Sequence, residues 1–188
     1  KHFCCNNLEY DRLHQSSDVD ERTLRELYYR PFQIACEANP VSVMCSYNRI
    51  NGTYAAEYKK GFDVLRNEFG FNGVVFSDWG AVRDRTASAK AGLDLSMPVC
   101  DDHYQKLRAD YEAGRLTDEE LDRCAQRVLD LIYRCKAMHQ GKQVAKTEKK
   151  RAEAAKAIAA DGMVLLKNDG LLPLGGAKRI SVCGCFAK

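Results

Sequence analysis

The chain has 188 residues and a formal net charge of +3 at pH 7. Hydrophobic residues make up 45% and charged residues 29%, which is the composition of a globular protein with a substantial core. The charge is too small to predict binding to nucleic acid or to an anionic membrane surface. No apolar run approaches the roughly 18 residues that a membrane-spanning helix needs. We therefore expect neither a nucleic-acid nor a membrane partner.

The cysteine content is high, with nine residues, but none of them forms a C-x-x-C pair. The sequence also lacks a His/Asp cluster at metal-ligand spacing, so we expect no metal site and no cofactor. Free thiols in this number are typical of a reducing compartment and favour a cytoplasmic location. Residue 1 is Lys, and the start of the chain therefore says little about a leader segment.

Helical and strand patterns alternate along the first two thirds of the chain. Asp18, with Glu21 three residues later, is a plausible cap for a first helix, which Pro31 would interrupt or kink. The dipeptide Asn51-Gly52 indicates a tight turn, and Thr117 with Glu120 forms a capping box before a long apolar stripe. Further helices are predicted over 54–69, 82–91 and 101–111.

The predicted strands cover 41–47, 73–78 and 93–97, and each is followed by helical sequence. Residues 1–7 read as the end of another strand that passes into a loop. Short strand–helix repeats predict a parallel sheet, either a closed barrel or a doubly wound sheet. The repeats are too few for a whole eight-stranded barrel, which takes about 250 residues.

The last third of the chain has a different composition. Residues 139–150 are polar and rich in lysine, and Thr147 is a plausible cap for a helix that reaches residue 160. Strands are predicted over 162–170 and 179–184. We expect three parts: 1–138, a linker and helix at 139–160, and the start of a further α/β domain at 161–188.

The segment Ser77-Asp78-Trp79 follows the apolar run that begins at Gly73. Asp78 is thus expected where a parallel strand ends, which is where strand–helix barrels gather their catalytic side chains. The residues alone leave a second interpretation open, since Asp is also a common N-cap of the helix that follows a strand.

Several motifs, in order, resemble glycoside hydrolase family 3, which includes the β-glucosidases. The resemblance covers nearly the whole chain, and Ser77-Asp78-Trp79 is similar to the family's nucleophile motif. The other blocks are Lys1-His2-Phe3, Arg22-Thr-Leu-Arg-Glu-Leu-Tyr28, Met44-Cys-Ser-Tyr-Asn48, Ala91-Gly-Leu-Asp-Leu95, Val164-Leu-Leu-Lys-Asn168 and Leu172-Pro-Leu174. The resemblance implies an α/β fold: a partial (β/α)8 (TIM-like) barrel, then a linker and the first strands of an α/β sandwich domain.

The resemblance also implies roles for individual residues. Asp78 would be the nucleophile of a retaining, exo-acting β-glucosidase that forms a covalent glycosyl-Asp intermediate on a β-linked oligosaccharide or aryl glycoside. Lys1, His2 and Tyr47 would contact the sugar or lie beside the nucleophile, and Trp79 would offer an apolar face to it. Arg12 could pair with a carboxylate or contact sugar, whereas Asp94 is expected to be structural.

No residue of this chain is assigned as the acid/base. The family supplies it from the second domain or, in one subgroup, from a His in a barrel loop. That subgroup carries Lys-His-Phe-Pro-Gly, whereas this chain reads Lys1-His2-Phe3-Cys4-Cys5. We expect the acid/base beyond residue 188, and little activity from the 188 residues alone. The alternatives are a β-xylosidase or α-arabinofuranosidase of the same family, and an inactive or merely carbohydrate-binding fragment.

Overall fold

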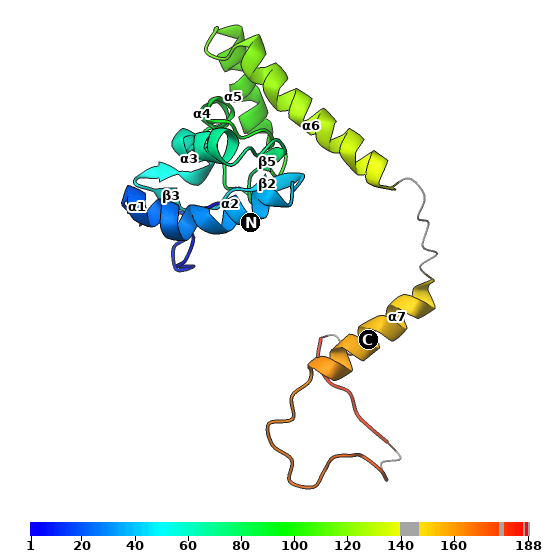
Figure 1. Ribbon diagram of the computed structural model, residues 1–188. Coiled ribbons are helices and arrows are strands. Elements are labelled where there is room, and N and C mark those ends of the chain that lie inside the picture. Colours follow the sequence, from blue (N-terminus) through cyan, green and yellow to red (C-terminus); the bar gives the residue numbers. More distant parts are fainter. Residues whose placement is uncertain (140–146, 177–178, 186, 188) are drawn as a thin grey trace. The chain divides into compact units, whose positions relative to one another are not determined.

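The computed structural model describes residues 1–139, 147–176, 179–185 and 187 (Figure 1). The chain divides into two compact units, residues 1–140 and residues 141–188. The predicted linker at 139–150 falls largely on residues outside the described ranges. Each unit is described by itself.

Two short parallel strands lie at the centre of the first unit. They are β2 (Ser42–Met44) and β5 (Val74–Phe76), which lie side by side with Ser42 opposite Val74 (Figure 1). Val74 and Val75 are fully buried, as expected for a parallel strand covered by helices. A Cβ on Gly73 would lie 2.3 Å from the Val41 carbonyl oxygen, so only glycine allows β5 to begin so close to that backbone.

Single bridges extend this pair on both sides. Phe3 forms a parallel bridge with Cys45, and Leu95 forms one with Phe76. The order in space, Phe3, β2, β5 and Leu95, therefore repeats the order in the chain. The strand predicted over 93–97 was wrong in extent, because the Met97 N–H donates to Ser77 Oγ at 2.7 Å instead of continuing a ladder.

The first helical run consists of α1 (Glu21–Thr23), η1 (Leu24–Tyr29) and α2 (Arg30–Glu37). Its N-cap is Asp20, whose carboxylate accepts the Thr23 N–H at 2.9 Å. The prediction of Asp18 as the cap was wrong, because Asp18 accepts the Ser16 hydroxyl at 2.7 Å. Pro31 does not break the run. It lies in the first turn of α2, directly after the π-helical η1, where its missing N–H is tolerated.

A second small sheet combines β1 (Ser16–Ser17), β3 (Arg49–Ile50) and β4 (Thr53–Tyr54). Asn51 and Gly52 both have positive φ, 49° and 84°, as a two-residue hairpin turn requires, which confirms the predicted turn. The single helix predicted over 54–69 was wrong at its start, because Tyr54 pairs in β4. The chain instead continues as η2 (Ala55–Glu57), α3 (Lys59–Asp63) and η3 (Val64–Glu68).

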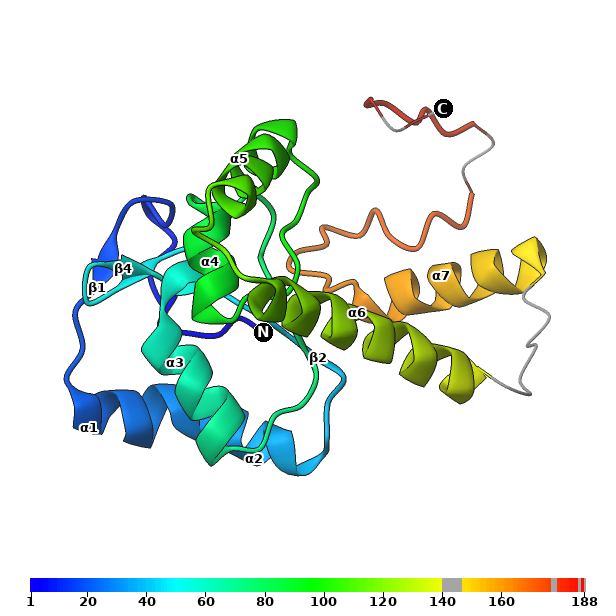
Figure 2. The same cartoon turned by 90° about the horizontal axis from the view of Figure 1, so that it is seen from above.

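Three more helices follow β5. They are α4 (Arg85–Ala91), α5 (Asp101–Glu112) and α6 (Asp118–His139), and α4 and α5 pack side by side (Figure 2). The predicted capping box before α6 is confirmed. The Thr117 N–H donates to Glu120 Oε2 at 3.0 Å, and the Glu120 N–H donates to Thr117 Oγ1 at 3.3 Å.

An aromatic cluster fixes the N-terminal segment against the helices. The Phe3 ring stacks on Tyr29 at 5.6 Å between centroids and meets the edge of Phe32 at 4.9 Å. Phe62 of α3 lies 6.3 Å away on the same core. Phe3 is 2% exposed, so its burial anchors the two residues that precede it.

The second unit contains α7 (Glu148–Gly162), and its predicted cap is confirmed because Thr147 accepts the Lys150 N–H. The strands predicted over 162–170 and 179–184 are wrong for the residues that the structure describes there. A strand needs a neighbouring strand for its backbone hydrogen bonds and its apolar face. The described residues of this unit provide neither, and Leu166 is 91% exposed.

All nine cysteines are free thiols. In the described ranges, no three His, Cys, Asp or Glu side chains come together as ligands for a metal ion. No described helix is both long enough and apolar enough to cross a membrane.

Candidate active site

The backbone after β5 is fixed by the segment that carries Leu95 and Met97. The Ser77 N–H donates to the Leu95 carbonyl at 2.9 Å, and the Gly80 N–H donates to the Met97 carbonyl at 2.8 Å. Ser77 is buried, whereas the next side chain, Asp78, is partly open to solvent. The carboxylate thus leaves the carboxyl end of a parallel strand, as predicted.

The two carboxylate oxygens of Asp78 have different surroundings. Oδ1 accepts the Trp79 backbone N–H at 2.7 Å and lies 3.1 Å from the Tyr47 hydroxyl. Oδ2 lies 3.2 Å from His2 Nε2, and the Asp78 side chain is 18% exposed. Asp78 does not cap the following helix, because the N-cap of α4 is Asp84, which accepts the Ala87 N–H at 2.9 Å.

Tyr47 links the carboxylate to its surroundings. Its hydroxyl also lies 2.9 Å from the Trp79 carbonyl oxygen, so its single proton is shared between two acceptors. Burial raises the pKa of Tyr47, and the hydrogen bond to Asp78 and the charge of Asp78 raise it further. The phenol is therefore a protonated donor at neutral pH. The Arg12 guanidinium lies over the Tyr47 ring, 4.7 Å from its centre, and pairs with Glu9 at 2.7 Å.

The other predicted sugar-contacting residues are placed differently. Trp79 is 65% exposed, so its ring is not packed into the core of this unit. His2 reaches the carboxylate, as stated above, through a side chain that is 35% exposed. Lys1 is exposed, and its ammonium group makes no hydrogen bond or ion pair with Asp78 in the part of the chain that the structure describes. The structure therefore brings His2, Tyr47 and the Trp79 backbone to Asp78. We refer to Asp78, His2, Tyr47 and Trp79 as the Asp78 site.

Asp94 is a second carboxylate near β5, but its environment is closed. Oδ2 accepts from Arg66 at 2.7 Å and from the Val75 N–H at 2.8 Å, and Oδ1 accepts from Arg127 at 2.9 Å. The Asp94 side chain is 0% exposed. We call Asp94, Arg66 and Arg127 the Asp94 network. Sequence reasoning assigned no partner to Asp94, and the only available signal was the presence of two arginines in predicted helices.

Arranged in this way, the Asp78 site has the features of a carbohydrate-processing site: an accessible carboxylate with one oxygen held by donors, beside an exposed indole. Comparison with known proteins gives the class directly. Residues 1–131 match the family model described as the glycosyl hydrolase family 3 N terminal domain. The chain therefore belongs to glycosyl hydrolase family 3.

Relatives of this family are similar over the whole chain. "Thermostable beta-glucosidase B" of Acetivibrio thermocellus is 41% identical over 100% of this chain and 25% of its own length. "Exo-alpha-(1->6)-L-arabinopyranosidase" of Bifidobacterium breve is 40% identical over 100% of this chain and 26% of its own. Most of the curated relatives compared are beta-glucosidases.

Solved structures show the same α/β fold. The GH3 beta-glucosidase of Bifidobacterium adolescentis matches 90% of this chain with a TM-score of 0.72 and 43% identity. Beta-glucosidase 3B from Thermotoga neapolitana, in complex with alpha-D-glucose, matches 92% with a TM-score of 0.74 and 35% identity. The matches cover 25% and 26% of those two chains, so this chain spans about a quarter of their length.

Proposed function

We propose that this chain carries the nucleophile of a retaining, exo-acting β-glucosidase, and that the nucleophile is Asp78. The observation that supports this most is the asymmetry of its carboxylate. Oδ1 is held by the Trp79 N–H and the Tyr47 hydroxyl, whereas among the described residues Oδ2 has only the partly exposed His2 imidazole as a side-chain partner. Oδ2 is thus the oxygen left to attack an anomeric carbon.

In the proposed reaction, Asp78 Oδ2 forms a bond to the anomeric carbon while the glycosidic C–O bond breaks. A separate acid gives its proton to the leaving oxygen. Water, activated by the same group as a base, then hydrolyses the glycosyl-Asp ester and frees Asp78. The hydrogen bond from the Tyr47 hydroxyl to the charged Asp78 carboxylate keeps Oδ1 oriented and holds the side chain in one rotamer.

Sugar binding is assigned to the side chains around this carboxylate. The exposed Trp79 indole offers an apolar face to the C–H groups of a pyranose ring. His2 and Lys1 would donate to sugar hydroxyls, which raises specificity because a mismatched sugar leaves buried polar groups unpaired.

We place the acid/base outside this chain. In the described residues, the hydrogen bonds and ion pairs of the Asp78 carboxylate are with His2, Tyr47 and the Trp79 backbone, and none is with a second carboxyl group. The relatives are about four times as long as the part matched. Asp78 would therefore react only when further protein is present.

The fold proposed for that longer protein contains a partial (β/α)8 barrel in residues 1–138, a linker and helix in 139–160, and the start of an α/β sandwich domain in 161–188. The sequential order of Phe3, β2, β5 and Leu95, all parallel and separated by helices, supports a barrel over a doubly wound sheet. Both outer edges of this sheet would pair with further strands.

Substrate class is tested with the full-length protein and four aryl glycosides: β-glucoside, β-xyloside, α-L-arabinofuranoside and α-L-arabinopyranoside. We expect the highest kcat/KM for the β-glucoside. The pentosides are included because an arabinopyranosidase is among the relatives. A preference for a pentoside would overturn the β-glucosidase assignment but keep Asp78 as nucleophile.

The nucleophile is tested separately with Asp78→Ala in the full-length protein. The alanine variant should lose turnover, and added azide should restore part of it and release a glycosyl azide of inverted configuration. Unimpaired turnover would remove Asp78 from the mechanism. The 188-residue chain by itself should show little or no hydrolysis, and appreciable turnover by it would contradict the placement of the acid/base.

A further inference from the structure

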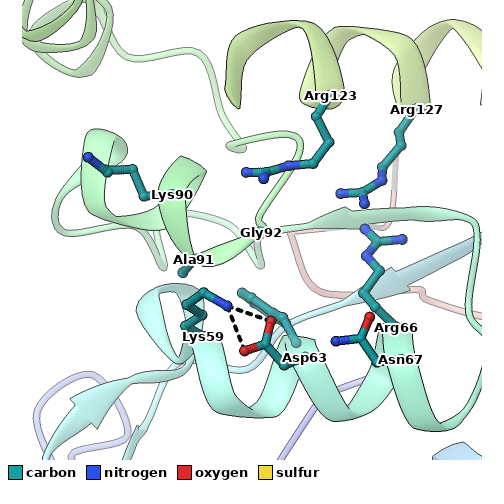
Figure 3. Close-up of a pocket in the computed structure, with 10 residues that line it drawn as sticks. Lys59, Asp63, Arg66, Asn67, Lys90, Ala91, Gly92, Arg123 and Arg127 are labelled. Atoms are coloured by element: carbon teal, nitrogen blue, oxygen red, sulfur yellow. Dashed lines mark hydrogen bonds and ion pairs between the residues drawn. The ribbon is translucent and has the colours of Figure 1, made fainter. Parts of the chain in front are cut away.

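A cationic pocket of about 200 Å³ lies in the helical layer of the first unit, and it shares no lining residue with the Asp78 site. Its walls come from α3, η3, α4 and α6. Figure 3 shows Arg123 and Arg127 of α6 projecting toward Gly92 and toward Arg66 of η3. The charged lining side chains are Lys59, Asp63, Arg66, Lys90, Arg123 and Arg127.

The charges around this pocket do not balance. Lys59 pairs with Asp63 at 2.6 Å (Figure 3), and Lys90 lies 4.0 Å from Glu120. Arg66 and Arg127 share the single carboxylate of Asp94. The five cations therefore meet three carboxylates, which leaves two positive charges in excess.

Arg123 is the cation without a carboxylate partner among the residues that the structure describes. One of its terminal nitrogens donates to the Ala89 carbonyl at 3.0 Å. Its Nε, like the Nε of Arg66, is buried with no acceptor in the described part of the chain. Burial lowers the pKa of Arg66, and the positive charges of Arg127 and Arg123 lower it further. The negative charge of Asp94 opposes this by raising it. The pocket thus combines excess charge with unsatisfied donors.

We propose that this pocket binds a phosphoryl dianion, either free inorganic phosphate or the phosphate group of a sugar phosphate. A dianion matches the two excess charges. A tetrahedral oxyanion also supplies several acceptors to guanidinium groups, which bind phosphate through paired N–H donors. The volume of the pocket suits one such group and does not suit a nucleic-acid backbone, for which the net charge of +3 is also small.

The test is calorimetric titration of the full-length protein with inorganic phosphate, in a phosphate-free buffer held at constant ionic strength with chloride. Saturable binding to one site is expected. Arg123→Gln should weaken it by at least about tenfold, since it removes the unpaired guanidinium. Arg108→Gln is the matched control: it also removes one positive charge, from an exposed pair with Glu112 on α5, and should leave binding unchanged.

A thermal melt shows that the variant is folded. Without phosphate, Arg123→Gln should melt at or above the temperature of the parent protein, because a like charge is removed. With phosphate, the melting temperature of the parent should rise and that of Arg123→Gln should not. Equal phosphate binding by the parent protein and Arg123→Gln would overturn the proposal. So would a rise in the parent's melting temperature with chloride that equals the rise with phosphate.

A second set of titrations distinguishes free inorganic phosphate from the phosphate group of a sugar phosphate. Glucose 6-phosphate, inorganic phosphate and glucose are compared on the same protein. Tighter binding of the ester than of inorganic phosphate assigns the pocket to a sugar phosphate, and the reverse assigns it to the free ion. A crystal structure of the full-length protein in which an acidic side chain pairs with Arg123 would overturn both assignments.

Discussion

Two aspartates near β5 have opposite surroundings. Each accepts one backbone N–H, but the Asp78 side chain is partly exposed beside a hydroxyl and an imidazole, whereas the Asp94 side chain is fully enclosed and pairs with two guanidinium groups. A carboxylate whose two oxygens are each paired with a partly buried arginine has no oxygen free for a reacting carbon. The comparison teaches that solvent access and the type of partner, more than proximity to the strand, separate a candidate nucleophile from a structural anchor.

The largest effect expected from this comparison is on catalysis. Asp78→Asn in the full-length protein should lower kcat by about a thousandfold or more, because an amide cannot form the glycosyl ester. Its melting temperature should stay close to that of the parent protein. Asp122→Asn, at an exposed position on α6, is the control. An Asp78→Asn protein that unfolds would instead place Asp78 with the structural residues.

The reverse pattern is expected for Asp94. Asp94→Asn should lower the free energy of unfolding by about 3 kcal/mol, because the partly buried Arg66 and Arg127 would lose the buried counter-charge that they share. The measurement is urea denaturation of the full-length protein. Sugar hydrolysis by the fraction that remains folded should be little changed. A stable variant that has lost activity would mean that Asp94 belongs to the Asp78 site.

A smaller effect is expected at Tyr47. Tyr47→Phe removes the hydroxyl that lies 3.1 Å from Asp78 Oδ1, and a hydrogen bond to a charged group contributes about 1.5–3 kcal/mol. We expect kcat/KM to fall by about ten- to a hundredfold while azide rescue of Asp78→Ala is preserved in the double variant. Because the pKa of Tyr47 is raised, raising the pH toward 10 should not reproduce the loss. A fall in the kcat/KM of the parent protein toward pH 10 that is as large as the effect of Tyr47→Phe would contradict this.

The smallest effect, taken per pH unit, concerns Cys45, which directly follows β2 and whose N–H donates to the Phe76 carbonyl at 2.9 Å. Burial raises the pKa of its thiol to about 12, above the ordinary value of about 8.5. The folded chain therefore holds this proton after the unfolded chain has lost it. Stability from this group is complete below about pH 8.5 and is lost as the pH rises toward 12, by about 1.4 kcal/mol per pH unit.

This loss is measured as the difference in pH slope between the parent protein and Cys45→Ala, from urea denaturation between pH 9 and 11. Iodoacetamide at pH 9 provides a second readout, since the thiolate is the reacting form. Exposed Cys135 should be alkylated and buried Cys45 should not. Equal alkylation of the two would show that the segment carrying Cys45 opens readily.

Local sequence determined those features that depend on neighbours in the chain. The capping box at Thr117 and the hairpin turn at Asn51-Gly52 were predicted, because each depends on contacts within a few residues. The buried strand that precedes Asp78 was predicted from its apolar run, and its partner, β2, comes from about 30 positions earlier in the chain. The motif around Asp78 similarly indicated the family, which the match over residues 1–131 confirmed.

Tertiary structure decided the rest. Asp78 meets Tyr47 from 31 positions away, and Asp94 meets Arg66 and Arg127 from 28 and 33 positions away, which no local pattern specifies. The strands predicted over 162–170 and 179–184 failed for the same physical reason. An apolar run becomes a strand only when a second strand takes its hydrogen bonds, and the sequence of the run does not contain that partner.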